Sequence, residues 1–295
     1  MRDVMKMDKR ELAFSLLPQA WREQADLRAD QEVEEIRLRV GRNPTVLNRG
    51  AEKPFLRRCV EENDLFRILE KATDASMHAA EASFSQGYVN YRGLRIGVCG
   101  AAQMVNGQIK AFHRISSLAI RIPREYRGIC ALEIHEMLDR GMQNTLVLGP
   151  PGAGKTTALR EIIRCLSESG YRVGVVDERN ELAALDREGP AFDLGKCSDV
   201  LTGLSKADAM MMLLRGMNPQ IIAMDEISRL EDLEALEQIT GSGVWILASA
   251  HGGSLVELRF RRAFREALDR QLFPSVLHVS MQGGERHYRM ERLQP

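Results

Sequence analysis

The chain has 295 residues, of which 44% are hydrophobic and 28% charged, and its 41 Lys and Arg balance 41 Asp and Glu. This composition is typical of a globular protein with room for two domains, and the balanced charge neither favours nor excludes nucleic-acid binding. The five cysteines are scattered without a CxxC pair, which argues against a disulfide framework or zinc site and favours the cytosol. Residues 1–10 lack the apolar stretch of a signal peptide, and the apolar runs are too short to span a bilayer.

The first part of the chain predicts a small α+β domain over residues 1–125. Residues 1–31 have the apolar spacing of a helical segment, which Pro18 bends or breaks. Glu35–Val40 alternates strictly between polar and apolar residues, which is typical of a half-buried strand. The other expected elements are strands at Thr45–Leu47, Tyr88–Tyr91, Arg95–Cys99, Gln108–Phe112 and Leu118–Ile122, and helices at Glu62–Lys71 and Ser76–Ser83. Pro123 and the polar residues after it predict a linker.

Residues 126–295 predict an α/β domain with a mostly parallel sheet between helices, because strands and helices alternate there. The expected strands are Thr145–Leu148, Tyr171–Asp177, Gln220–Asp225 and Val244–Ala250, and the helices are Lys155–Ser169, Ser205–Met217 and Arg229–Thr240. Because Tyr171–Asp177 follows the first of these helices, we expect it to lie beside Thr145–Leu148. Near the end, Val276–Met281 and Arg286–Met290 flank Gly283-Gly284, which predicts a hairpin.

The segment Gly149–Thr156 has the pattern of a phosphate-binding P-loop: Gly, four residues and Gly-Lys-Thr between a strand and a helix. Its glycines let backbone N–H groups point at phosphate oxygens, and the helix N-terminus adds partial positive charge. We expect Lys155 to reach the β- and γ-phosphates of ATP and the Thr156 hydroxyl to bind Mg²⁺. The residues expected to hold the nucleotide are Gly149, Pro150, Pro151, Gly152, Ala153, Gly154, Lys155, Thr156 and Thr157. The domain is therefore predicted to be a RecA-like P-loop ATPase core.

An apolar strand that ends in two acids, Asp225 and Glu226, supplies the next candidate residues. Such a strand is apolar because it is central and covered on both faces of the sheet. In P-loop proteins the aspartate at this place holds Mg²⁺, directly or through water, and a glutamate after it polarises the attacking water. We therefore expect Asp225 to bind the metal and Glu226 to be catalytic.

A second strand ends in the acidic run Asp177–Glu181. Asp177, Glu178 or Glu181 is a candidate to lie beside the γ-phosphate and hold water or metal, and Glu178 is taken as the catalytic candidate. The alternative is an ordinary solvated strand end with local pairing to Arg179.

A third strand ends on polar residues, among them Ser249 and His251. Ligands bind at the carboxyl ends of parallel strands, so either side chain is a candidate to hydrogen-bond the γ-phosphate and report its loss. The alternative for His251 is an ordinary surface residue. Gly252-Gly253 then supplies a mobile turn.

Between Ala82 and Arg124 the chain has no acidic residue but six basic ones: Arg92, Arg95, Lys110, Arg114, Arg121 and Arg124. Three interpretations stay open: arginine fingers for ATP in cis or from a neighbouring subunit, a nucleic-acid surface, or a solvated basic face. A second basic cluster, expected on one helix, is interpreted as a solvated face or a subunit interface; it contains Arg259, Arg261, Arg262 and Arg265.

With these motifs in hand, the chain resembles the stage III sporulation protein AA family of endospore-forming bacteria. That family is similar to the secretion ATPases of type II and type IV systems and of pilus motors. The resemblance covers nearly the whole chain, and its most specific segments are Glu35–Arg42, Leu94–Gly100, Ser117–Ile122, Gly149–Thr156, Asp177–Glu181 and Asp225–Ile227.

The resemblance implies roles for several residues. Asp177–Glu181 resembles the acidic Asp box of secretion ATPases, and Glu226 matches the catalytic glutamate, although Asp225 stands where those enzymes have glycine. His251 resembles the histidine of their His box, in a Ser-Ala-His-Gly context that differs from Thr-x-His-Ala. Their N-terminal-domain arginines at the nucleotide are matched best by Arg95 and Arg121.

The sequence thus predicts a cytoplasmic, Mg²⁺-dependent ATPase. The resemblance implies a homohexameric ring with ATP between protomers, at the mother-cell side of the channel between mother cell and forespore. ATP hydrolysis is expected to drive assembly of, or transport through, that membrane complex. The expected partners are therefore other copies of this chain and the membrane proteins of the channel. We expect no nucleic-acid partner and no membrane-spanning segment in this chain. The alternatives are a nucleic-acid-handling ATPase of RecA-like fold and a nucleotide-gated scaffold that scarcely turns ATP over.

Overall fold

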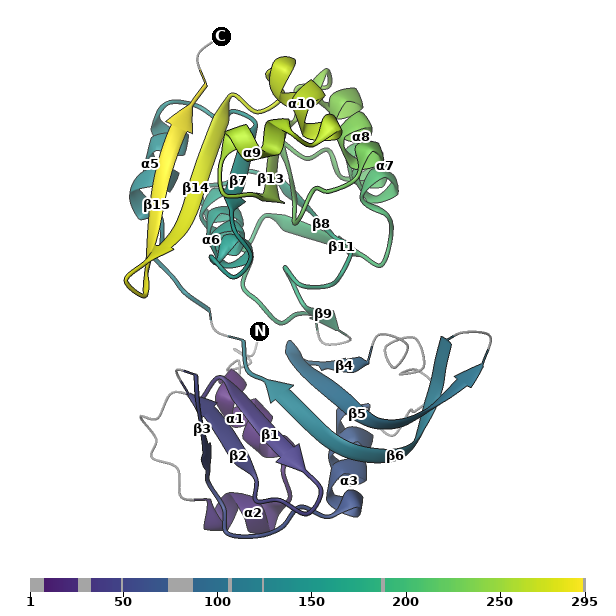
Figure 1. Ribbon diagram of the computed structural model, residues 1–295. Coiled ribbons are helices and arrows are strands. Elements are labelled where there is room, and N and C mark those ends of the chain that lie inside the picture. Colours follow the sequence, from purple (N-terminus) through teal and green to yellow (C-terminus); the bar gives the residue numbers. More distant parts are fainter. Residues whose placement is uncertain are drawn as a thin grey trace. The chain divides into compact units, whose positions relative to one another are not determined.

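The computed structural model describes residues 8–25, 33–48, 50–73, 87–105, 108–123, 125–186 and 189–293. The chain divides into two compact units, Met1–Arg124 and Glu125–Pro295, which are shown in Figure 1. The helix expected at Ser76–Ser83 lies outside the described residues. No helix of the described residues is long and apolar enough to cross a bilayer.

The first unit is built on a six-stranded antiparallel sheet in the order β3-β2-β1-β6-β5-β4. Its strands are β1 (Glu35–Arg39), β2 (Thr45–Asn48), β3 (Ala51–Pro54), β4 (Tyr88–Tyr91), β5 (Leu94–Val105) and β6 (Gln108–Arg121), and its helices are α1 (Lys9–Leu16), α2 (Gln19–Gln24) and α3 (Glu62–Ala72). The two short strands expected within β6 are one long strand, which continues because it pairs with β5 along its whole length through three register shifts. As expected, Pro18 separates two helices.

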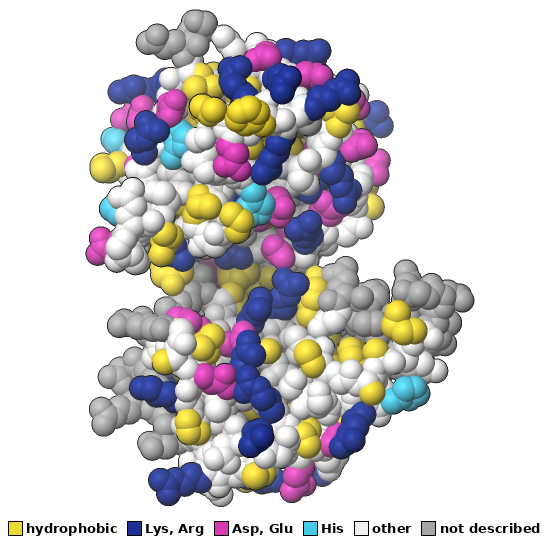
Figure 2. Space-filling model, in the orientation of Figure 1, with side chains coloured by type: hydrophobic (Ala, Val, Ile, Leu, Met, Phe, Trp, Pro, Cys, Tyr) yellow, Lys and Arg dark blue, Asp and Glu magenta, His cyan; other side chains and the backbone are white. Residues whose placement is uncertain are grey.

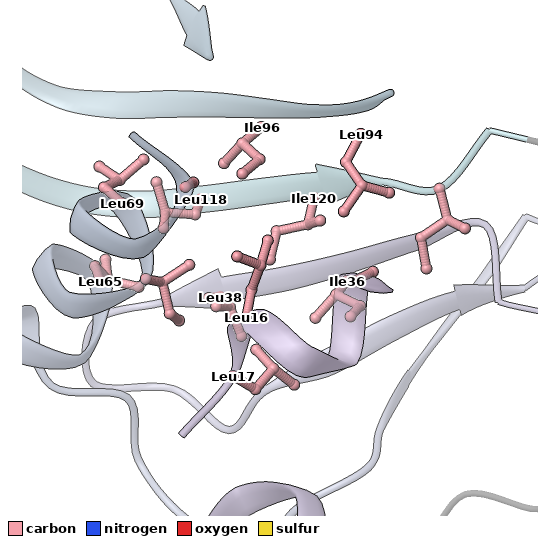
Figure 3. Close-up of a cluster of buried hydrophobic side chains, with 14 of the residues drawn as sticks. Leu16, Leu17, Ile36, Leu38, Leu65, Leu69, Leu94, Ile96, Leu118 and Ile120 are labelled. Carbon is pink, nitrogen blue, oxygen red and sulfur yellow. The ribbon is translucent and has the colours of Figure 1, made fainter. Parts of the chain in front are cut away.

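Alternating side chains give the first sheet one apolar face and one polar face. Ile36 and Leu38 of β1 are fully buried, as are Ile96 of β5 and Ile120 of β6. Figure 3 shows these residues together with leucines from the region of α1 and from α3, which cover the apolar face. The polar face of β1 carries Glu35, Arg37 and Arg39.

The second unit contains a seven-stranded sheet in the order β11-β8-β12-β13-β7-β14-β15, parallel except for β15. The strands are β7 (Thr145–Gly149), β8 (Val173–Asp177), β11 (Ser198–Thr202), β12 (Ile221–Met224), β13 (Trp245–His251), β14 (Ser275–Gln282) and β15 (Glu285–Arg292), and β9 (Leu185–Asp186) pairs with β10 (Gly189–Pro190) apart from them. The helices are α5 (Ala131–Asp139), α6 (Lys155–Glu168), α7 (Lys206–Met217), α8 (Leu230–Thr240), α9 (Leu255–Arg259) and α10 (Arg262–Asp269).

Helices cover both faces of this second sheet. One apolar cluster joins the sheet to α7, α8 and α10, and another joins it to α5 and α6. Every residue of β7, β8 and β12 is buried, which explains why these central strands are mostly apolar in the sequence. The α/β class is therefore confirmed, with the mostly parallel sheet between helices.

The position predicted for one strand of this sheet, β8, is wrong. We expected the strand after the first helix to lie beside β7, but β8 pairs with β11 and β12. Because the crossover through α6 is long enough to pass over other strands, β12 and β13 from later in the chain occupy the places between. The tip of β13, and not that of β8, therefore lies next to the loop that follows β7.

The expected hairpin near the C-terminus is confirmed. β14 and β15 pair along their whole length, and the turn residues Gly283 and Gly284 have φ of 58° and 85°. Glycine adopts this left-handed conformation without the strain that other residues meet. The elements α5, α9, β3 and β9 to β11 were not expected. β9 and β10 have only two residues each, and β3 and β11 contain few apolar residues and show neither an alternating nor a continuous apolar pattern.

Candidate functional site

The loop between β7 and α6 has the backbone of a phosphate cradle. Gly152 and Gly154 have φ of 76° and 100°, in the left-handed region, and α6 begins directly after Gly154. Gly149 has no such φ; a Cβ there would lie 2.3 Å from the Val279 carbonyl oxygen of β14, so glycine permits close approach at this place. Backbone N–H groups at the N-terminus of a helix favour an anion, which fits the nucleotide phosphates expected here.

Lys155 is the first residue of α6, and its side chain is inside the site. The residue is only 5% exposed, and Nζ lies 2.9 Å from the Pro150 carbonyl oxygen and 2.8 Å from His251 Nδ1. Burial lowers the pKa of Lys155, although the charges of Asp225 and Glu226 oppose this. Because a charged ammonium only donates hydrogen bonds, His251 Nδ1 must accept, and the ring hydrogen is on Nε2.

The other side of the His251 ring faces the expected catalytic glutamate. His251 Nε2 lies 3.4 Å from Glu226 Oε1, so His251 connects Lys155 to Glu226. Glu226 has φ of 44°, which costs a residue with a side chain about 1–3 kcal/mol. Its Oε2 accepts a hydrogen bond of 3.0 Å from Arg179 Nη1. Arg179 therefore pairs with Glu226, a residue at the end of another strand.

Asp225 links the end of β12 to the P-loop. Its Oδ2 accepts a hydrogen bond of 2.7 Å from the Thr156 hydroxyl, and its Oδ1 accepts one from the Ser249 hydroxyl at the end of β13. A hydroxyl and a carboxylate side by side suit Mg²⁺, which takes most of its ligands from water and substrate phosphates. Within the described residues no group of three or more His, Cys, Asp and Glu side chains is placed to hold a metal.

The acids at the end of β8 have other partners. Asp177 is 2% exposed, and its carboxylate accepts hydrogen bonds of 2.7, 3.0 and 2.8 Å from the backbone N–H groups of Glu181, Leu182 and Ala183. Burial raises the pKa of Asp177 despite these three bonds. Asp177 therefore shapes the loop that follows β8 and has its acceptors in use.

Glu178 belongs to a separate ionic group. Its Oε2 lies 2.6 Å from Lys206 Nζ and its Oε1 3.7 Å from Arg229 Nη1. Burial raises the pKa of Glu178, but the hydrogen bond and charge of Lys206 and the charge of Arg229 outweigh it, so the net shift is downward. The structure thus joins Glu178 to cations on α7 and before α8, whereas Asp225, Glu226, Ser249 and His251 interact with one another or with the P-loop.

Arg95 and Arg121 lie in the first unit, so their role toward the nucleotide stays a prediction. The register places Glu35, Arg121 and Arg95 side by side on β1, β6 and β5. Glu35 accepts from Arg37 Nε and, at 3.1 Å, from Arg121 Nε, while the Arg95 guanidinium lies 3.8 Å from the centre of the Tyr88 ring. Figure 2 shows a line of Lys and Arg side chains on this unit.

The second basic cluster is not on one helix, as expected, but is divided between α9 and α10. Arg259 ends α9 and Arg262 begins α10, because the chain turns between them. Local acids accompany its arginines: Asp269 lies 2.7 Å from Arg259, Glu257 3.8 Å from Arg261, and Glu266 3.8 Å from Arg262.

Comparison with known proteins agrees with this architecture. Among solved structures, the pilus retraction motor PilT with bound ADP superposes with a TM-score of 0.62 at 21% identity, over 90% of this chain and 80% of PilT. The Legionella pneumophila ATPase DotB superposes with a TM-score of 0.60 at 16% identity, over 99% of this chain and 82% of DotB. At such identities the likeness shows the fold alone, and it confirms the RecA-like fold of these ATPases.

Sequence comparison gives the family. The chain is 33% identical over 160 residues to the Arabidopsis thaliana protein SEEDLING PLASTID DEVELOPMENT 1, and this match covers 50% of this chain and 23% of that protein. It is 35% identical over 260 residues to stage III sporulation protein AA of Bacillus subtilis strain 168, spanning 86% of this chain and 84% of that protein. The model of the family described as sporulation stage III, protein AA matches residues 7–289. The chain therefore belongs to the sporulation stage III protein AA family.

Proposed function

We propose that the protein is a Mg²⁺-dependent ATPase that works in sporulation. The observation that carries the proposal is the convergence of two strand ends, those of β12 and β13, on one P-loop: Thr156 contacts Asp225, and Lys155 contacts His251, which faces Glu226. A lysine, a hydroxyl–carboxylate pair and a glutamate in one place are what phosphoryl transfer to water needs.

The residues then have distinct tasks. Lys155 exchanges its contacts with Pro150 and His251 for phosphate oxygens, and the loop backbone holds the remaining phosphates. Thr156 and Asp225 would hold Mg²⁺, which when bound would neutralise negative charge on the phosphates. Glu226 orients and polarises the attacking water, and His251 is freed to respond to the γ-phosphate because Lys155 no longer occupies its Nδ1.

Family membership supports the wider role. As a member of the sporulation stage III protein AA family with the fold of DotB and PilT, the protein acts as a ring of copies at the mother-cell side of an envelope channel. Arg95 and Arg121 serve as arginine fingers in this proposal. Mass measurement in solution with and without a non-hydrolysable ATP analogue tests it, and a monomer under both conditions would contradict the ring.

The direct test of the site is Lys155→Ala. We expect ATP affinity to fall by about a hundredfold or more, because the variant loses the hydrogen bonds of a charged ammonium to the phosphates, and such bonds are stronger in a buried site. The matched control is Lys196→Ala, which removes an exposed lysine paired with Glu168 near the other end of α6 and should leave binding unchanged. Equal phosphate release by Lys155→Ala and the parent protein would end the assignment.

One alternative has an observation in its favour. The line of Lys and Arg side chains on the first unit (Figure 2) suits a nucleic-acid backbone, so ATPase stimulation by single-stranded DNA or RNA that disappears at high salt would favour a nucleic-acid-handling role. Glu35 and Glu52 of the first unit pair with Arg37, Arg39 and Arg121, and these carboxylates reduce the net positive charge of the sheet that carries them. The channel role is therefore the better supported.

A further inference from the structure

Arg286, the second residue of β15, has a buried donor with no acceptor. Its Nε is shielded from solvent and forms no hydrogen bond with any described residue. Within the same residues no carboxylate lies at ion-pairing distance from Arg286; its guanidinium instead lies over the Tyr126 ring, 4.8 Å from the ring centre. An unsatisfied N–H on a charged group is costly to bury, so this arrangement needs a reason.

The guanidinium lies against the P-loop. A Cβ built on Gly154 would meet Arg286 Nε at 2.7 Å and the guanidinium carbon at 3.3 Å, so glycine at this position leaves room for the arginine. Gly154 directly precedes the first turn of α6. A cation is unfavourable at a helix N-terminus, where the backbone already carries partial positive charge. Arg286 and the N-terminus of α6 repel each other unless an anion lies between them.

The hairpin explains how Arg286 reaches this place. β14 pairs with β7 from Ser275 to His278 and then continues past the end of that strand, with Val279 against Gly149. The turn at Gly283 and Gly284 brings β15 back, so that Arg286 pairs with Met281 in the part of the hairpin beyond β7. Figure 1 shows the hairpin beside β7 at the edge of the sheet. The hairpin thus forms the wall of the P-loop on the β14 side.

The two sides of the P-loop have different residues. On the β13 side are the groups that the proposed reaction assigns to the transferred phosphoryl group, namely His251, Asp225 and Glu226. Arg286 comes from the opposite side, through β14 and β15. A nucleotide whose γ-phosphate faces the β13 side has its nucleoside end on the β14 side.

We infer that Arg286 binds the α-phosphate of the nucleotide, which is the phosphate nearest the nucleoside. The Tyr126 ring packs against the guanidinium and holds it in place. This inference rests on the proposed function, since it needs a nucleotide in the P-loop. ATP and ADP share this phosphate, so Arg286 contributes equally to holding substrate and product. It is a binding residue, and hydrolysis of bound ATP does not depend on it.

The test compares Arg286→Gln with Arg289→Gln, which removes the same charge from an exposed position of the same strand. Calorimetric titration with ADP and with a non-hydrolysable ATP analogue should show affinity about tenfold lower for both ligands in Arg286→Gln, and within about twofold of the parent in Arg289→Gln. Arg286→Lys, which keeps the charge without the planar donor, should be intermediate. Without nucleotide, Arg286→Gln should unfold at the same temperature as the parent or higher, because a half-buried charge whose buried Nε has no acceptor is gone.

Three outcomes would overturn the inference. These are ADP affinity in Arg286→Gln equal to the parent, a loss confined to the ATP analogue, or a nucleotide-free variant that unfolds at a clearly lower temperature, which would show a packing role. If Lys155→Ala loses ADP binding while Arg286→Gln keeps it, the inference fails and the proposed function stands. If the parent protein binds neither ligand, both fail together.

Discussion

An Asp-Glu pair lies at the C-terminal end of β8 and another directly after β12, and the two pairs have different surroundings. Asp177 at the end of β8 is buried and binds three backbone N–H groups of its own loop, while Asp225 at the end of β12 binds Thr156 of the P-loop. The local sequences are alike: an apolar strand followed by two acids. The difference arises from strand order, because only β13 separates β12 from β7, whereas both β12 and β13 separate β8 from it.

The two strand ends are nonetheless connected. Arg179, two residues after Asp177, donates to Glu226, so the loop that Asp177 shapes also holds the expected catalytic carboxylate. We therefore interpret the first acidic pair as support and the second as the reacting centre. We therefore expect substitutions in the pair after β12 to affect hydrolysis and substitutions in the pair at the end of β8 to affect stability. Three measurements test this difference.

The largest expected effect comes from Glu226→Gln. ATP hydrolysis should fall by about a hundredfold or more, because the amide cannot polarise water, while ATP binding stays within about twofold of the parent. Glu178→Gln is the matched control, since it makes the same change in the other pair, and its rate should stay within about threefold. Steady-state phosphate release measures both variants, and equal losses would remove the distinction between the two strand ends.

An intermediate effect is expected for Asp177→Ala, on stability. The change leaves three backbone N–H groups without acceptors in a buried loop, and we expect about 2–3 kcal/mol lower free energy of unfolding in urea. Asp225→Ala should cost less, because two of its three donors are hydroxyls that rotate to other acceptors. The interpretation would be reversed if Asp225→Ala were the more destabilised of the two.

The smallest expected effect is a pH dependence from Glu178. Its folded pKa lies below the ordinary value of 4.5, so its contribution to stability is complete above that pH and is lost as the pH falls through the folded value. The parent should therefore lose up to about 1 kcal/mol more than Glu178→Gln on acidification below this range. Urea unfolding at a series of pH values measures the difference, and parallel curves for the two proteins would show that the Lys206 pair adds nothing.

The fold was largely predictable because its main elements are local patterns. The P-loop, the buried strands and the helices with apolar faces each show in a short stretch of sequence, and strands such as Ile221–Met224 were placed to within one residue at each end. Strand order was not predictable in the same way, because it depends on which crossover passes over which strand. The expectation that β8 lies beside β7 was wrong for this reason.

In the candidate site, too, residues within a local motif could be predicted and residues from distant strands could not. Lys155, Thr156, Asp225 and Glu226 carry a spaced motif, and the structure brings them together. Arg179 and Arg286 act across strands that are distant in the sequence, and nothing in their local sequence distinguishes them from surface arginines. Only the positions of Glu226 Oε2 and of the Gly154 backbone reveal them.

The two hydrogen bonds of Lys155 reduce the free energy that an anion gains by binding to it. Its ammonium already donates to the Pro150 carbonyl and to His251, so an arriving anion gains only the difference between its own bonds and these two. Free inorganic phosphate offers little beyond that exchange. In the proposed function a triphosphate would also engage the loop backbone and the Thr156 hydroxyl, so we expect the protein to bind the nucleotide in preference to free phosphate.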